Sequence, residues 1–140
     1  MKQHDTRLTV RFSEVDSFGV VWHGHYINYF EQGRLDLTSR FGLSPEDLRG
    51  LGLFAPVVDI RCRLRSPARF PDVLTIGTTV KPSEKAMLTF AFRLMRDSDG
   101  ALLAEGETSH VLLTLSGTML YEVPTELKHR IDAMLDSLHG

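Results

Sequence analysis

The sequence predicts an α+β fold in which a curled, mostly antiparallel sheet wraps around one long helix. Three observations lead to this prediction. The hydrophobic pattern gives the order strand, long helix, four strands, helix. The later strands are joined by connections of hairpin length, as antiparallel neighbours allow. Gly33 lies in the apolar stripe of the long helix, where close approach of another backbone would compensate for its low helix propensity.

The N-terminal part of the chain predicts a strand, a turn and the long helix. Residues 6–13 alternate between apolar and polar side chains, as a half-buried strand does. Residues 16–19 predict a turn in which Gly19 can take a positive φ. From about residue 23 to residue 41 the spacing becomes helical, and Gly42 ends the helix. The apolar residues are Leu8, Val10 and Phe12 in the strand, and Tyr26, Phe30, Gly33, Leu37 and Phe41 in the helix.

Four further strands and a second helix are predicted after a short loop or helical turn at residues 44–52. The sequence Asp97-Ser-Asp-Gly100 is a hairpin signal, and residues 67–71 supply another turn. Pro124 lies near the start of a C-terminal amphipathic helix. The expected strands are residues 54–65, 73–81, 88–96 and 102–115, and the stripe of the last helix is Leu127, Ile131, Leu135 and Leu138.

Length and composition are those of an ordinary globular domain. We expect residues 1–140 to form a single domain with one core. The net charge of −2 gives no general attraction to nucleic acid or to an anionic membrane. The single cysteine, Cys62, excludes an internal disulfide and a multi-cysteine zinc site. No secretory segment or long apolar run is found, so the expected location is the cytoplasm.

Several kinds of functional site are disfavoured by their sequence context. His23 and His25 have a metal-binding spacing for a strand, but on a helix they lie about 200° apart and cannot bind one ion. The chain has no Gly-x-Ser-x-Gly elbow of a serine hydrolase. A glycine pattern at residues 49–55 follows a helix instead of a strand, which is the wrong context for a dinucleotide site. We therefore expect no metal and no cofactor.

Asp16 suggests a different chemistry, because it lies between a strand and the start of a helix. The first N–H groups of a helix can stabilise negative charge that develops on a carbonyl oxygen. A nearby carboxylate can attack the carbonyl carbon or deprotonate a water molecule. A thioester suits this arrangement, since its thiolate leaving group, with a pKa of about 8–9, needs little acid assistance. Asp16 can equally form an Asx-turn or cap the helix, and His23 can simply be a helix-start residue.

Residues 16–34 resemble the signature segment of hot-dog-fold acyl-CoA thioesterases of the 4-hydroxybenzoyl-CoA thioesterase type. The segment reads Asp16-Ser-Phe-Gly-Val-Val-Trp-His-Gly-His-Tyr-Ile-Asn-Tyr-Phe-Glu-Gln-Gly-Arg34. The family pattern is approximately Asp-x-x-Gly-hydrophobic-Val-x-His-x-x-Tyr-x-x-x-Phe-Glu-x-x-Arg. Residues 66–73 and the strand order agree more loosely. The resemblance implies a hot-dog fold with a sheet of five to six strands, and hydrolysis of an acyl-CoA to a free acid and CoA.

The resemblance also implies roles for single residues. Asp16 matches the family's nucleophile or general base. His23 matches the position whose backbone N–H polarises the thioester carbonyl, and also the histidine that some members use. Relatives that combine these two residues often carry a tyrosine where this chain has Phe12, and His25 replaces a common asparagine. The substrate-binding candidates of the segment are Gly19, Val20, Trp22 and Tyr26. Homodimers, often paired into homotetramers with active sites at the subunit interface, are implied as well.

Coenzyme A needs positive charge for its phosphates. Arg61, Arg63 and Arg65 alternate along one predicted strand and so share a face, with Arg69 nearby. They are the candidate phosphate site, and the alternative is a solvated strand face or ion pairs at a subunit contact. Two other functions remain open for this fold: a dehydratase or hydratase in which Asp16 and His23 form an acid/base pair, and a non-catalytic acyl-CoA sensor. The acyl group, and an acyl carrier protein in place of CoA, are also left open.

Overall fold

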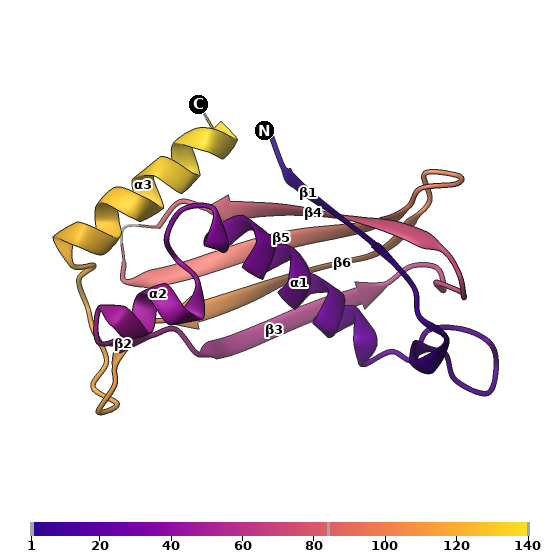
Figure 1. Ribbon diagram of the computed structural model, residues 1–140, viewed down its shortest axis with the longest axis horizontal. Coiled ribbons are helices and arrows are strands. Elements are labelled where there is room, and N and C mark those ends of the chain that lie inside the picture. The colour runs from indigo at the N-terminus through magenta and orange to yellow at the C-terminus, as the bar shows by residue number, and fades with distance from the viewer. Residues whose placement is uncertain (1, 84, 140) are drawn as a thin grey trace.

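A five-stranded antiparallel sheet with the strand order β1-β4-β5-β6-β3 forms the body of the computed structural model, which describes residues 2–83 and 85–139 (Figure 1). A short ribbon of β2 and β7 lies beside it. The strands are β1 (His4–Thr9), β2 (Leu53–Phe54), β3 (Val57–Leu64), β4 (Val73–Lys81), β5 (Met87–Arg96), β6 (Leu102–Val111) and β7 (Leu113–Thr114). The helices are the 3₁₀ helix η1 (Phe12–Glu14), α1 (His25–Ser39), α2 (Pro45–Gly50) and α3 (Thr125–His139).

Helix α1 lies across one face of the sheet, and the predicted stripe from Tyr26 to Leu37 is its buried side (Figure 1). The helix ends at Ser39, two residues before the predicted end, so Phe41 lies outside it and is only partly buried. The ring of Phe30 stacks on Phe92 of β5, with 4.8 Å between the ring centroids. A Cβ atom at Gly33 would lie 2.7 Å from both Ile76 Cγ2 and Thr78 Oγ1 of β4, so only glycine lets the helix approach the sheet this closely. The expected close approach at Gly33 is confirmed, but the atoms that approach are side-chain atoms of β4 and not another backbone. A sheet curled around a central helix is the hot-dog fold that the resemblance implies.

The predicted strand at residues 6–13 is wrong at its C-terminal end. β1 stops at Thr9, and the chain turns into η1, because the side chain of Glu14 accepts a hydrogen bond from the backbone N–H of Arg11 (2.7 Å). Val10 is 1% exposed, as expected, whereas Phe12 is 75% exposed and does not share its face. The alternation of apolar residues therefore continued beyond the strand only by coincidence.

Two other predicted strands are each divided in two. The region 54–65 is interrupted at Pro56, which has no N–H for a sheet hydrogen bond, so β2 and β3 are separate strands. The region 102–115 is divided at Leu112 into β6 and β7. The strand at residues 73–81 is confirmed with its predicted ends, and the hairpin at residues 97–100 is confirmed with Gly100 at a φ of 70°.

The C-terminal helix is also confirmed. Leu127, Ile131 and Leu138 are buried, as predicted, and Met134 joins them, whereas the predicted Leu135 is only partly buried. Near the end of α3 the backbone N–H of Lys2 donates a hydrogen bond to the carbonyl of Leu138 (3.1 Å). No helix in the described parts of the chain is long and apolar enough to cross a membrane.

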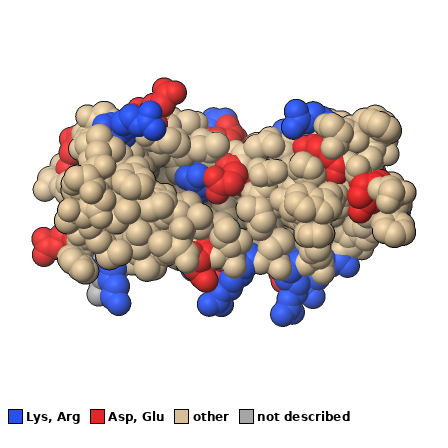
Figure 2. Space-filling view, turned by 90° about the horizontal axis from the view of Figure 1, so that it is seen from below, with Lys and Arg blue, Asp and Glu red and all other residues tan. Residues whose placement is uncertain are grey.

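β3 forms one edge of the sheet, and every one of its residues is exposed. Figure 2 looks onto the molecule from below, the side on which β3 lies in Figure 1, and shows a broad uncharged surface between scattered charged groups. The exposed apolar residues of this strand are Val57, Val58, Ile60 and Leu64. An apolar strand edge with unpaired backbone groups is a surface that proteins usually cover.

Candidate active site

A hollow of about 300 Å³ lies beside the start of α1. One side of its lining comes from the loop before α1 and from the first turn of the helix. The other side comes from residues 64–67 at the end of β3, which are distant from the loop in the sequence. Among the residues selected from the sequence, it brings together Asp16, Val20, His23, Tyr26 and Arg65. The remaining lining residues are Val21, Leu64, Ser66 and Pro67.

The loop of residues 15–24, here called the site loop, is held by its own backbone. The N–H of Asp16 donates to the carbonyl of Val20 (2.8 Å), and the N–H of Gly19 donates to the carbonyl of Asp16 (3.0 Å). Gly19 has a φ of 80°, a conformation that other residues rarely adopt, which confirms the predicted turn. The N–H of Val21 donates to the carbonyl of Ala68 (2.8 Å) and so attaches the loop to the segment after β3.

The carboxylate of Asp16 is only partly occupied by local contacts. Its Oδ1 atom accepts a hydrogen bond from the N–H of Phe18 (2.8 Å), which is the Asx-turn considered from the sequence. Within residues 2–83 and 85–139, no hydrogen bond to its Oδ2 atom is found. One oxygen therefore holds the turn, and the other is available to a substrate or to water in the hollow.

The start of α1 offers backbone donors beside this carboxylate. The helix begins at His25, two residues later than expected, because residues 23 and 24 form a turn with Gly24 as the N-cap. The N–H of His25 donates to Trp22 (2.9 Å). For the N–H groups of His23 and Gly24, no acceptor is found in the described part of the chain. Unpaired N–H groups at the positive end of a helix can stabilise an oxyanion.

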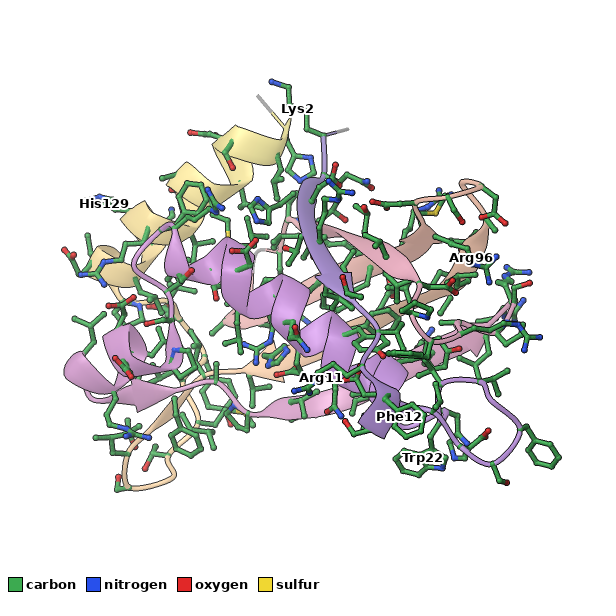
Figure 3. All side chains as sticks on the ribbon, turned by 45° about the vertical axis from the view of Figure 1, so that its right-hand side comes forward. Lys2, Arg11, Phe12, Trp22, Arg96 and His129 are labelled. Carbon is green, nitrogen blue, oxygen red and sulfur yellow. The ribbon has the colours of Figure 1, made fainter. Side chains whose placement is uncertain are left out.

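Trp22 covers the helix start and does not line the hollow. Its indole ring lies 4.8 Å from the ring of His23 and 5.6 Å from that of His25, measured between centroids, and it is 49% exposed. Figure 3 shows Trp22 at the end of the molecule where α1 begins. The Nδ1 atom of His25 lies 3.2 Å from the side-chain nitrogen of Asn28. Over the described residues, no group of three His, Cys, Asp or Glu side chains is arranged to hold a metal ion.

Tyr26 connects the helix to the opposite wall of the hollow. Its hydroxyl accepts a hydrogen bond from the backbone N–H of Ala68 (3.0 Å). Burial raises the pKa of Tyr26, so the phenol remains protonated at neutral pH. The same wall is held from β5 by the guanidinium of Arg96, which donates to Asp72 (3.0 Å) and to the carbonyl of Pro67 (2.8 Å). The hollow is therefore framed by fixed elements on both sides.

The arginines of the predicted phosphate site are divided between two hollows. Arg65 follows the end of β3, lines the Asp16 hollow and donates to Glu105 (2.6 Å). Arg61 and Arg63 line a second hollow of about 470 Å³ together with Arg93 of β5. Because residues alternate along a strand, this second hollow lies on the face of the sheet opposite α1.

Sequence reasoning missed the residues that complete or support the site. Leu64, Ser66 and Pro67 form part of its wall. Residues 66–73 agree loosely with the family, but that agreement does not identify any of the three as a site residue. Glu14 is 4% exposed and lies two residues before Asp16. It is in phase with the apolar residues Leu8, Val10 and Phe12, and this was a usable signal, because buried acids are rare and need partners.

Comparisons with known proteins agree with this architecture. Residues 10–131 match the family model described as the thioesterase-like superfamily. The acyl-CoA thioester hydrolase YbgC of Escherichia coli is 26% identical over 100 residues, which are 71% of this chain and 74% of YbgC. The crystal structure of protein TT1821 from Thermus thermophilus is 34% identical with a TM-score of 0.82, and the match covers 93% of this chain and 98% of that one. A DHNA-CoA thioesterase from Staphylococcus aureus, 22% identical, shares the fold with a TM-score of 0.86 over 98% of this chain and 93% of its own.

Proposed function

Because the chain belongs to the thioesterase-like superfamily, we propose that it hydrolyses the thioester of an acyl-CoA to a free acid and CoA. One observation carries the proposal. The carboxylate of Asp16 and the start of α1 line the same hollow, and the N–H of His23 has no acceptor in the described chain. A nucleophile or base and an oxyanion donor are the two groups that thioester hydrolysis needs.

In this mechanism the thioester carbonyl oxygen accepts hydrogen bonds from the N–H groups of His23 and Gly24. The free oxygen of Asp16 then attacks the carbonyl carbon, the C–S bond breaks, and water hydrolyses the resulting anhydride. Alternatively, Asp16 takes a proton from a water molecule, and that water attacks the carbonyl carbon directly. In both routes the leaving group is a thiolate, which departs with little help from an acid.

The surroundings of Asp16 supply few other polar groups for this reaction. The ring of Phe12 packs edge-on against Phe70, with 5.7 Å between centroids, and it carries no hydroxyl that could take the role of the tyrosine in related enzymes. The main contribution of His23 is its backbone N–H, while its imidazole lines the hollow and can orient water. Asp16 therefore performs the chemistry with the helix start as its principal partner.

Substrate binding follows from the same geometry. Val20 and Tyr26 lie beside the thioester in the hollow. Gly19 does not line the hollow and contributes through the turn that it forms, and Trp22 covers the helix start from outside. The name of the E. coli relative gives acyl-CoA as its substrate, and we propose the same class here, with acyl carrier protein as the alternative carrier. Arg65 lines the hollow, so it is the first positively charged residue beside the CoA part of a bound substrate. Arg61 and Arg63 extend the positive charge along β3.

We also propose that the protein assembles as a homodimer or homotetramer. The exposed edge strand β3 supports this, since pairing with a second copy would satisfy its backbone groups and bury its apolar side chains. Light scattering at micromolar concentration measures the assembly, and an active monomer there would contradict it.

The function is tested by measuring thiol release from a panel of aliphatic and aromatic acyl-CoA substrates. Asp16→Asn should lower kcat by about 10²–10⁴, the usual loss when a general base is removed. His23→Ala keeps its N–H and should lower kcat only about tenfold. Asp136→Asn, on the exposed side of α3, is the matched control and should have no effect.

The same assay separates the other two functions considered from the sequence. A sensor would bind acyl-CoA without releasing thiol, and a hydratase would add water to an enoyl-CoA without releasing thiol. An Asp16→Asn variant that remained within a few-fold of the wild type on a good substrate would show that the mechanism is wrong.

A further inference from the structure

Glu14 is a buried acid to which the reaction above assigns no role. The residue is 4% exposed, and its carboxylate has three hydrogen-bond donors around it. Oε1 accepts from the backbone N–H of Arg11 (2.7 Å) and from the hydroxyl of Tyr29 (3.0 Å), and Oε2 accepts from the guanidinium of Arg11 (3.3 Å). A carboxylate is expensive to bury, and an apolar residue would fill the same space at lower cost.

The protonation states of this group are well defined. Burial by itself raises the pKa of a carboxyl group, but the hydrogen bonds from Arg11 and Tyr29 outweigh it and lower the pKa of Glu14 from its ordinary value of 4.5. Burial, and then the negative charge of Glu14, raise the pKa of Tyr29. At neutral pH the pair is therefore an ionised acceptor and a protonated donor, which gives a strong and directional hydrogen bond.

The main chain of Glu14 is bonded to the helix start. Its carbonyl accepts the N–H of Trp22 (2.9 Å), the residue directly before His23. The next residue, Val15, pairs with Val21 across the site loop. Through its side chain, Glu14 is also bonded to Tyr29, one helical turn into α1 beyond Tyr26. Figure 3 shows Arg11 and Trp22 at the same end of the molecule, where η1 and α1 meet.

We propose that Glu14, held by Tyr29, is a positioning residue that fixes Asp16 relative to the N–H groups of His23 and Gly24, an inference that rests on the proposed thioester hydrolysis. The residue joins the two halves of the site: Asp16 follows it by two positions, and Trp22 and α1 are both bonded to it. A displacement of about 1 Å between reacting groups can cost about a hundredfold in rate, so a rigid connection here controls kcat.

The test uses Tyr29→Phe, which removes one hydrogen bond and keeps the ring, and Glu14→Gln, which removes the charge and keeps the shape. The control is Ile131→Val in α3, a buried residue away from the site whose substitution lowers Tm without touching the site loop. We expect Tyr29→Phe and Glu14→Gln to lower kcat about tenfold to a hundredfold, with KM changed less than about threefold. Ile131→Val should leave kcat unchanged.

A second readout does not depend on activity. Trp22 is the only tryptophan of the chain, and its N–H is bonded to Glu14, so its fluorescence reports the helix start. Tyr29→Phe should change its emission maximum and its quenching by acrylamide, and Ile131→Val should change neither. If the wild type hydrolyses acyl-CoA but Tyr29→Phe matches Ile131→Val in kcat and in fluorescence, the inference is overturned. If the wild type releases no thiol, the proposed function is refuted, and with it the effect of Glu14 on kcat. The fluorescence comparison then still decides whether Glu14 fixes the helix start.

Discussion

The indole ring of Trp22 lies so close to Gly24 that a Cβ atom at residue 24 would come within 2.0 Å of it. Residue 24 is the N-cap of α1, and its N–H is among the groups at the helix start for which no acceptor is found in the described residues. The absence of a side chain at this position therefore lets the largest aromatic ring of the chain cover the helix start without moving the backbone donors.

Replacing Gly24 by alanine should damage catalysis more than stability. The new methyl group must displace Trp22 or tilt the N-cap, and either movement shifts the donors that hold the thioester oxygen. We expect kcat/KM for acyl-CoA to fall at least about tenfold, the scale for loss of oxyanion contacts. Gly50→Ala is the matched control, because nothing lies within 4 Å of a Cβ there. Equal kcat/KM values for Gly24→Ala and Gly50→Ala would mean that the ring of Trp22 can move without an effect on catalysis.

The arginines should act on binding and not on chemistry. If they contact the CoA phosphates, alanine at Arg65 should raise KM for acyl-CoA much more than it lowers kcat, with smaller effects at Arg61 and Arg63. A short acyl-pantetheine, which lacks the nucleotide, should be hydrolysed almost as well by the variants as by the wild type. Lys128→Ala on α3 serves as a charge control away from both arginine hollows. Equal losses on both substrates would indicate a structural role.

Gly33→Ala should lower the free energy of unfolding. Alanine favours the helix by about 1 kcal/mol over glycine, but its methyl group would lie 2.7 Å from Ile76 and from Thr78, and overpacking of this kind costs about 1–3 kcal/mol. We expect a net loss of about 1 kcal/mol in urea denaturation. A variant more stable than the wild type would show that α1 can move away from β4 without cost.

Stability should fall as the pH drops below about 6.5, because of His110. Its ring is buried, with Nδ1 3.0 Å from the carbonyl of Ala55 and Nε2 3.1 Å from the hydroxyl of Thr108. Burial lowers the pKa of His110 from its ordinary 6.5, so below that pH the unfolded chain binds more protons than the folded one. The free energy of unfolding should decrease from about pH 7 to about pH 5, and His110→Asn should flatten this dependence. Parallel profiles of the two proteins would contradict the prediction.

Much of the fold could be predicted because its signals are local. The stripe that contains Gly33 and the strand at residues 73–81 depend on spacing alone, and both are confirmed. The end of β1 could not be predicted, since it depends on a bond between Glu14 and the backbone of Arg11 that alternation does not reveal. In the site, Asp16 and His23 could be predicted because they lie in one continuous sequence segment. The wall at residues 64–67 could not, because only the folded sheet places these residues beside Asp16. The alternation of residues along a strand likewise does not predict that Arg65 lines a different hollow from Arg61 and Arg63.

The hydrogen bond between Lys2 and Leu138 has a practical consequence for work with this protein. It brings the first and last described parts of the chain side by side at the end of α3, away from the end at which α1 begins (Figure 1). A surface tether or a fluorescent reporter attached at either end would therefore leave access to Asp16 open. The same proximity suits circular permutation, in which a short linker joins the old ends and new ones are opened at the exposed hairpin of residues 97–100.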